Sequence, residues 1–167
     1  DYNILQDGKT VCGLVSDPLI QDNKIYIASE DQVTCLSEDG KVIWKTPLPE
    51  KLTSRLRIFV DKGILYVINT GYAYFDGKKI QYGMPFVAAF EQENGKQIYM
   101  TNLEKGFVVD YQVADNKLYL LQPLRMATID LVSGNLLSRE VLPVPDRTEI
   151  IAFPHIGFYE AEGNAYK

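Results

Sequence analysis

Short strand-like runs fill the chain, and they recur in a fixed order. Three of them have an acidic residue and a turn, followed by an apolar residue, Tyr and a second apolar residue, in "DNKIYIAS", "DKGILYVIN" and "DNKLYLLQ". Val, Ile and Tyr at a period of two are typical of β-strands, whereas no segment keeps a period of 3.6 for the length of a helix. The pattern therefore predicts an all-β protein.

The spacing of the strand tyrosines gives the length of the repeat. Tyr26 and Tyr66 are 40 residues apart, as are Tyr119 and Tyr159, while Tyr66 and Tyr119 are 53 apart. Each unit adds an apolar strand before the Tyr strand, another after it, and a last strand behind a Gly turn. Repeats of about 40 residues with four short antiparallel strands are typical of β-propeller blades. The sequence predicts a single partial propeller over 1–167, with units at 11–50, 54–104, 106–143 and, truncated, 147–167.

Such a set of units is too small to close into a ring. A propeller closes when its last blade meets its first, and small closed rings have at least four blades. The remaining blades then come either from a longer polypeptide, which is the favoured alternative, or from a second copy of the chain. The apolar faces of an open ring would otherwise invite association.

The longer step between two of the tyrosines contains an insertion at residues 69–85. Its sequence, "NTGYAYFDGKKIQYGMP", has aromatic residues on both sides of Asp-Gly, a strong signal for a two-residue hairpin turn. We expect an extended hairpin that leaves its blade. Because such an arm lies outside the core of the blade, its aromatic side chains must pack on a neighbouring blade, another subunit or a ligand.

The arm is the candidate partner-binding site. A Tyr ring adds contact area at little cost in rotamer entropy, and its hydroxyl stays available to water or to a partner. The alternative is that the hairpin lengthens two strands and folds over the propeller's own surface. The candidate partner-binding residues are Tyr72, Tyr74, Phe75 and Tyr82.

Composition and charge narrow the classes of partner. The formal net charge of −5 disfavours a sequence-independent grip on nucleic acid, because no basic field attracts phosphates. The sequence contains no run of 18 apolar residues, which is about the length that a membrane-spanning helix needs. We therefore expect no nucleic-acid partner and no membrane span, while the aromatic arm favours a protein partner.

Reactive side chains are few, and each has a plain structural alternative. Cys12 and Cys35 either pair in an oxidising compartment or fill the core as small apolar residues. The only histidine, His155, has no Ser or Cys motif near it and is either a loop or strand-end residue or a ligand. The carboxylates gather in turns without the spacing of a calcium loop, so we predict no metal site and no catalytic group. These turn carboxylates are Glu30, Asp31, Glu38, Asp39, Glu91 and Glu93.

One blade pattern resembles a known repeat. In residues 22–49 the Tyr strand is followed by "VTCLSEDG" and "GKVIW", which resembles the quinoprotein-like (PQQ-like) β-propeller repeat, similar to the propeller of the outer-membrane assembly lipoproteins. The resemblance implies that the Trp and the Gly turn dock neighbouring blades, in agreement with a large ring filling the wedge between two sheets. The blade-motif residues are Tyr26, Gly40, Trp44, Tyr66, Gly95, Tyr99, Tyr119 and Gly134, with Leu137 or Ser138 at the third aromatic position.

The same superfamily contains quinone-dependent dehydrogenases, which carry an adjacent Cys-Cys pair, a Trp platform under the cofactor and acidic calcium ligands. This chain has no adjacent cysteines, and its one Trp, Trp44, is assigned to the blade motif. We therefore expect no cofactor and no enzyme. The resemblance implies a periplasmic or cell-surface scaffold that presents loops and the arm to a protein. The alternatives are a fragment of an enzyme, or a ligand-sensing ectodomain, whose active groups lie in further blades.

Overall fold

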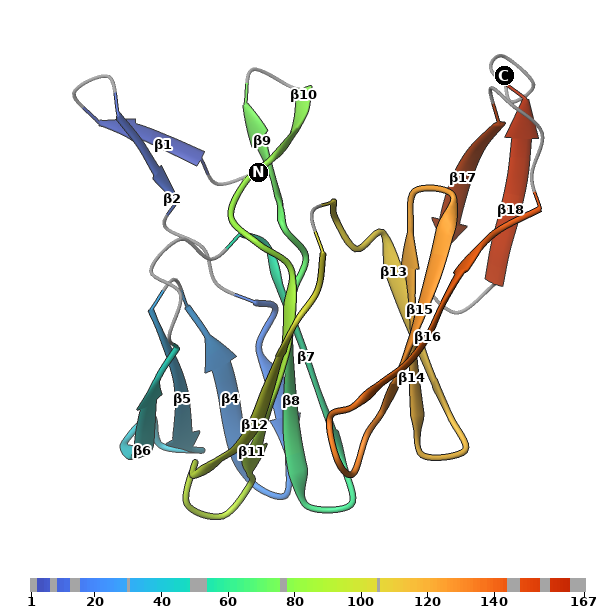
Figure 1. Cartoon of the computed structure of the whole chain (residues 1–167). Coiled ribbons are helices and arrows are strands. Elements are labelled where there is room, and N and C mark those ends of the chain that lie inside the picture. Colours follow the sequence, from blue (N-terminus) through green and yellow to red (C-terminus); the bar gives the residue numbers. More distant parts are fainter. Residues whose placement is uncertain are drawn as a thin grey trace. The chain divides into compact units, whose positions relative to one another are not determined.

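Among the residues that the computed structural model describes, strands are the only regular secondary structure. Three sheets of four antiparallel strands make up most of the chain (Figure 1). The predicted all-β class and partial β-propeller are confirmed. The chain divides into two units, residues 1–105 and 106–167, each of which is considered by itself. The described backbone covers residues 3–6, 9–12, 16–29, 31–48, 54–75, 78–104, 106–143, 148–153 and 157–162, with side chains described outside 3–12, 73–80 and 148–162.

The first sheet begins with a tight hairpin. Asp22 and Asn23 have φ angles of 51° and 59°, the left-handed pair that gives a two-residue turn matched to the twist of its strands. Asp and Asn tolerate this conformation better than most residues, which explains their place in the repeat. The strands, in spatial order, are β3 (Leu19–Gln21), β4 (Lys24–Ala28), β5 (Gln32–Ser37) and β6 (Val42–Pro47).

The second sheet, in the same unit, repeats this plan with one change. Lys62 and Gly63 form the first turn with φ angles of 49° and 77°. The chain leaves the sheet after its second strand and returns to it after the insertion. The strands, in spatial order, are β7 (Leu56–Asp61), β8 (Ile64–Asn69), β11 (Phe86–Glu91) and β12 (Gln97–Asn102).

The third sheet forms the main part of the second unit. Its first turn, Asp115 and Asn116, has φ angles of 49° and 58°, so the same hairpin turn occurs in all three sheets. The strands, in spatial order, are β13 (Asp110–Ala114), β14 (Lys117–Gln122), β15 (Arg125–Asp130) and β16 (Leu136–Val141).

Strand register shows which positions of the three sheets are equivalent. The third and fourth strands of each sheet are interrupted by a register shift at the same place, directly after one cross-strand pair. These pairs are Cys35 with Trp44, Ala89 with Tyr99, and Thr128 with Ser138. Of the two residues predicted for the third aromatic position, Ser138 rather than Leu137 therefore occupies it.

The core of the first unit joins its two sheets. Alternate residues of β4 and β5 point inward, and β8 and β11 are buried along most of their length, so apolar residues of both sheets form one cluster. Full burial of each large side chain contributes about 1.5–3 kcal/mol relative to exposure. The fully buried aromatic residues of this cluster are Tyr26, Phe86 and Phe90.

The first strand of the first sheet is short within the described residues. Of residues 16–21, only Leu19–Gln21 pairs in the sheet, because Pro18 lacks a backbone N–H. Ser16 still holds the preceding segment in place, since its N–H donates to the carbonyl of Ala28 at 2.7 Å and its Oγ accepts from the N–H of Ala28 at 3.0 Å. The predicted unit boundaries stay predictions.

Two small hairpins flank the sheets. β17 (Thr148–Phe153) pairs with β18 (Gly157–Glu162) in the region of the predicted truncated unit. β1 (Asn3–Gln6) pairs with β2 (Lys9–Cys12) and is absent from the sequence-based prediction, although Asp-Gly between them is a hairpin signal. No described segment forms a helix with the length and apolarity needed to cross a membrane.

Candidate functional site

The insertion forms a hairpin arm that continues beyond the ends of β8 and β11 (Figure 1, green). The arm consists of β9 (Tyr72–Phe75) and β10 (Lys78–Gln81). Phe75 pairs with Lys78, so two residues connect the strands, as the Asp-Gly signal predicts. The backbone of the first unit thus projects a two-stranded ribbon away from the second sheet.

The structure separates the four candidate residues of the arm. Tyr72 is 4% exposed, so its ring packs within the first unit at the root of the arm. Tyr82 is half-buried, and its backbone N–H donates to the carbonyl of Gly71 at 2.9 Å. The side chains of Tyr74 and Phe75 lie outside the described residues. A role in partner contact stays a prediction for the set, and Tyr72 has the least surface with which to make one.

A buried amide fixes the arm where it leaves the sheet. Asn69, fully buried, accepts at Oδ1 from the N–H of Ser54 at 3.0 Å and from the Ser54 hydroxyl at 2.5 Å. Asn69 Nδ2 donates to the carbonyl of Met84 at 2.7 Å, and the Ser54 Oγ accepts from the N–H of Gly71 at 2.7 Å. One side chain therefore links the segment before β7, the end of β8 and the return from the arm. Such a network is geometrically demanding because each partner must be satisfied away from water.

Thr70 extends the same anchor. Its side chain is fully buried, and both its N–H (3.0 Å) and its hydroxyl (2.6 Å) donate to the carbonyl of Arg55. The N–H of Arg55 donates to the carbonyl of Tyr72 at 3.3 Å. Residues 54 and 55 thus bind the root of the arm through both backbone and side chains, which we name the arm anchor (Ser54, Arg55, Asn69, Thr70 and Gly71).

Sequence reasoning missed the arm anchor because its members are ordinary polar residues. The available signal is the run Asn69, Thr70 and Gly71 directly after the apolar strand "ILYVI". Polar groups that end a fully buried strand need partners, but the sequence does not show that Ser54, fifteen residues earlier, supplies them. The pairing depends on the fold of the sheet.

Three blade-motif residues of the first unit, Tyr26, Trp44 and Gly95, lie at the junction of its two sheets. Trp44 is 8% exposed, and its indole N–H donates to the carbonyl of Gln92 at 3.2 Å. The Thr46 hydroxyl donates to the carbonyl of Gly95 at 2.6 Å. Gly95 has a φ of 74°, and a Cβ placed on it would lie 2.4 Å from Cε3 of the indole. The indole ring of Trp44 therefore lies directly against Gly95, in space that the Cβ of any other residue at position 95 would fill.

The side chain of Gln92 completes this junction. Its amide donates to the Tyr26 hydroxyl at 3.0 Å and to Oδ2 of Asp22 at 3.2 Å. The rings of Tyr26 and Trp44 are tilted at 45° with centroids 6.2 Å apart. Burial raises the pKa of the Tyr26 hydroxyl above its usual value, so this group stays neutral and bonds as a hydroxyl. The junction has the form of a structural contact between blades.

The remaining motif tyrosines and Cys35 are buried or half-buried. Tyr66 is 2% exposed and stacks on Phe59 with ring centroids 4.8 Å apart. Tyr99 and Tyr119 are half-buried. Cys35 is a free, fully buried thiol whose pKa is raised by burial, which agrees with the core alternative rather than with a bridge. The side chain of Cys12 lies outside the described residues.

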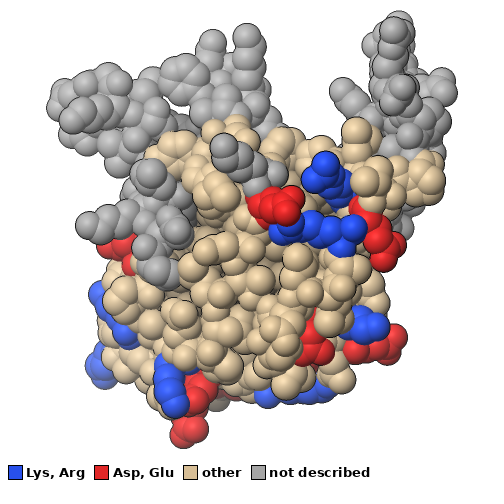
Figure 2. Space-filling model, viewed as in Figure 1, with Lys and Arg blue, Asp and Glu red and all other residues tan. Residues whose placement is uncertain are grey.

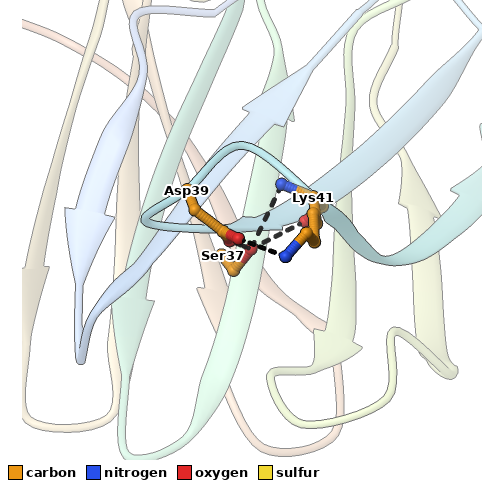
Figure 3. Close-up of polar contacts among 3 residues, drawn as sticks. All are labelled: Ser37, Asp39 and Lys41. Atoms are coloured by element: carbon orange, nitrogen blue, oxygen red, sulfur yellow. Dashed lines mark hydrogen bonds and ion pairs between the residues drawn. The ribbon is translucent and has the colours of Figure 1, made fainter.

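Two turn carboxylates, Asp39 and Asp130, accept hydrogen bonds from residues of their own turns. Asp39 accepts from the Ser37 hydroxyl and pairs with Lys41 at 2.6 Å between Nζ and Oδ2 (Figure 3). The Lys41 ammonium and the Ser37 hydroxyl lower the pKa of Asp39. Asp130 accepts from the N–H and the hydroxyl of Ser133, which lower its pKa in the same way. Glu30 and His155 lie outside the described residues.

Charges on the described surface are mixed. Figure 2 shows Lys and Arg side chains next to Asp and Glu side chains on the face it presents, with wide uncharged areas between them. Among the residues whose side chains are described, no three His, Cys, Asp or Glu side chains gather as metal ligands would. Interspersed charge of this kind is typical of a solvated surface.

The described residues do not fit a quinone cofactor. The only Trp, Trp44, rests on Gly95 and is covered at the sheet junction, so it offers no open platform for a second ring system. Cys35 has no cysteine next to it in the sequence.

A family model matches most of the chain. The family model described as "Outer membrane protein assembly factor BamB" matches residues 8–149. No curated protein matches the sequence significantly. The match covers all three four-stranded sheets and the arm.

Solved structures share the fold at low identity. BamB from Moraxella catarrhalis has a TM-score of 0.53 at 13% identity, covering 80% of this chain and 40% of that one. A quinohemoprotein alcohol dehydrogenase from Pseudomonas putida HK5 has a TM-score of 0.54 at 17% identity, covering 75% of this chain and 20% of that one. The computationally designed Ika4 protein has a TM-score of 0.57 at 9% identity, covering 97% of this chain and 98% of that one. The chain thus spans less than half the length of the first two, and the likeness concerns the fold.

Proposed function

Because the chain belongs to the BamB family of PQQ-like β-propeller repeats, we propose that it is a non-catalytic segment that binds a protein partner in the cell envelope through its hairpin arm. The observation that carries this proposal is the arm anchor, in which fully buried Asn69 ties both ends of the arm to the second sheet. The family description, an outer-membrane assembly factor, supports a periplasmic or cell-surface location for the segment.

An arm whose root is held in one orientation is well suited to binding a partner. Association costs free energy for every loop or side chain that it immobilises, so a ribbon that is already oriented loses less on binding. The arm anchor supplies that orientation without using the tip, because its hydrogen bonds reach no farther along the arm than Tyr72 on one side and Tyr82 on the other. The paired strands beyond them keep a free backbone edge on each side within the described hairpin, and an extended peptide can add to such an edge.

The proposal is tested with a variant whose arm is shortened while its anchor is left unchanged. Residues 74–79 are replaced by Asn-Gly, which keeps the pairs Tyr72 with Gln81 and Ala73 with Ile80 and supplies a two-residue turn. Full-length protein with either arm is crosslinked in its own cells, and the proteins attached to it are quantified by mass spectrometry. The proposal predicts that a discrete set falls at least tenfold with the short arm.

The control separates binding from folding. The shortened protein must keep the urea midpoint of the first unit, monitored by the fluorescence of Trp44. A retained midpoint with an unchanged set of crosslinked proteins would refute a binding role for the arm.

A further inference from the structure

The arm of β9 and β10 has two backbone edges, and the hydrogen bonds at its root show which residues face outward (Figure 1). In an antiparallel pair of strands, residues that bond to each other alternate with residues whose N–H and C=O groups point away from the partner strand. The N–H of Tyr82 donates to the carbonyl of Gly71 at 2.9 Å, so these two residues form a bonded pair. The pairs that point outward are therefore Tyr72 with Gln81, and Tyr74 with Lys79.

The outer edge of β9 is already in use at the root of the arm. The carbonyl of Tyr72, one of its outward groups, accepts from the N–H of Arg55 at 3.3 Å. The N–H of Thr70 donates to the carbonyl of Arg55 at 3.0 Å. Arg55 directly precedes β7, so the edge of β9 continues the side of the sheet on which β7 pairs. A further strand on this side would compete with Arg55.

The outer edge of β10 is open in the part of the chain that is described. β10 pairs there with β9 and with no other strand. On this side of the sheet β12 ends at Asn102, which pairs with Phe86, the first residue of β11. Lys79 and Gln81 thus each present an N–H donor and a C=O acceptor along the edge of β10.

A bulge explains why β12 does not continue along the arm. Asn69 pairs with Phe86, and farther out Gly71 bonds to Tyr82. Between these two pairs lie one residue of the outgoing strand and three of the return strand, 83–85. Extra residues of this kind bend the strand that contains them and interrupt pairing, often next to functional sites. The edge of β10 is thus separated from the edge along which β12 pairs.

The sequence of β10 favours one class of partner. It contains Lys78 and Lys79, the only two adjacent basic residues in the chain. Lys on an edge strand disfavours pairing with a second copy, because like charges would come together. An acidic strand is favoured, since opposite charges on neighbouring strands attract. Successive residues alternate between the two faces of a ribbon, so the partner needs an acidic residue on each face.

We propose that the protein partner adds an acidic, extended segment to the outer edge of β10. Antiparallel pairing, which is the more stable arrangement per residue, forms bonded pairs at Lys79 and Gln81. The segment then has two adjacent acidic residues opposite Lys78 and Lys79, and an apolar residue opposite Ile80. The inference rests on the proposed function and deepens it, because it assigns the edge of the arm and the chemistry of the segment that binds there.

A synthetic peptide tests the edge directly. The probe is the fluorescein-labelled peptide Thr-Thr-Val-Glu-Glu-Thr, in which Val and the two Glu residues follow the antiparallel order opposite Ile80, Lys79 and Lys78. A second peptide has the same sequence with N-methyl groups on the second Thr and the first Glu, whose N–H groups would bond to the arm. In anisotropy titrations with the full chain, the first peptide should bind at least tenfold more tightly than the second.

Two variants at position 81 test the same edge from the side of the protein. Gln81→Pro removes an outward N–H that the pairing with β9 does not use, and Pro is tolerated at such a position of an edge strand. The matched control, Gln81→Thr, changes the same exposed side chain and keeps the N–H. Gln81→Pro should weaken binding of the acidic peptide at least tenfold, and Gln81→Thr less than twofold.

A charge reversal tests the acidic character of the partner. Lys78→Glu together with Lys79→Glu should weaken binding of the acidic peptide at least fivefold, because two attractions become repulsions. The control makes the same change of charge at Lys45 and Lys117, which are exposed and lie outside the arm, and should leave binding unchanged. Equal effects of the two double variants would refute an acidic partner.

The remaining outcomes separate this inference from the proposed function. Equal binding of the two peptides, or no binding of either, would overturn the assigned edge, and this comparison leaves the protein unchanged. In cells, crosslinked proteins that are lost with the short arm should also be lost with Gln81→Pro. Their retention with Gln81→Pro would refute the edge alone, whereas retention with the short arm would refute the proposed function. Dimerisation of the unmodified chain that Gln81→Pro abolishes would show a second copy at the edge and contradict the acidic partner.

Discussion

Two glycines with similar backbone conformations differ in how much an added methyl group should cost in stability. Gly95 and Gly40 have φ angles of 74° and 81°, so alanine at either costs about 1–2 kcal/mol of backbone strain. At Gly95 the new Cβ would also lie 2.4 Å from the Trp44 ring, 2.6 Å from a second ring atom and 2.7 Å from the Thr46 hydroxyl oxygen. Forcing these atoms apart adds about 1–3 kcal/mol.

Gly95→Ala should therefore lower the free energy of unfolding by about 2–5 kcal/mol, and Gly40→Ala by only about 1–2 kcal/mol. Urea unfolding monitored by Trp44 fluorescence reports the first unit, because that residue is the only Trp in the chain. With a slope of about 2 kcal/mol per molar urea, the two midpoints should differ by about 0.5–1.5 M. Equal midpoints would refute the docking of Trp44 on Gly95.

Three further predictions address the anchor, the core thiol and the turns. Asn69→Ala should destabilise the first unit by about 2–3 kcal/mol, measured by the same urea unfolding, because it leaves buried backbone groups unpaired. In a Cys12→Ser chain, Cys35 should react with a thiol reagent at pH 8 only after unfolding, because burial blocks access and raises the pKa of the thiol. Asp39 and Asp130 have lowered pKa values in the folded chain, so their stabilisation is present above about pH 4 and lost below it. Replacing both by Asn should flatten the loss of melting temperature on acidification.

The repeat made most of the fold predictable. Tyr26 and Tyr66 mark equivalent strand positions because strands that bury one face repeat their inward residues, and the turn signals between them are local. The same logic located the arm, since Asp-Gly between aromatic residues determines a hairpin without reference to the rest of the chain. The third aromatic position could not be chosen between Leu137 and Ser138, because a register shift after Thr128 is invisible in the sequence.

The arm anchor could not be predicted from the sequence, for a different reason. Ser54 and Asn69 are unremarkable polar residues until the sheet brings them together at 3.0 Å. The burial of Tyr72 follows from the same packing. Long-range contacts of this kind depend on the assembled sheet, whereas turns and alternation depend on near neighbours.

Contact between the tip of the arm and a protein can be tested by site-specific crosslinking. A photo-crosslinking amino acid is placed at position 74, in the paired strand β9, and compared with the same probe in place of exposed Lys45 on β6. In full-length protein within its own cells, we expect a discrete protein adduct from position 74 that is absent from position 45. No adduct from position 74, or the same adducts from both positions, would contradict it.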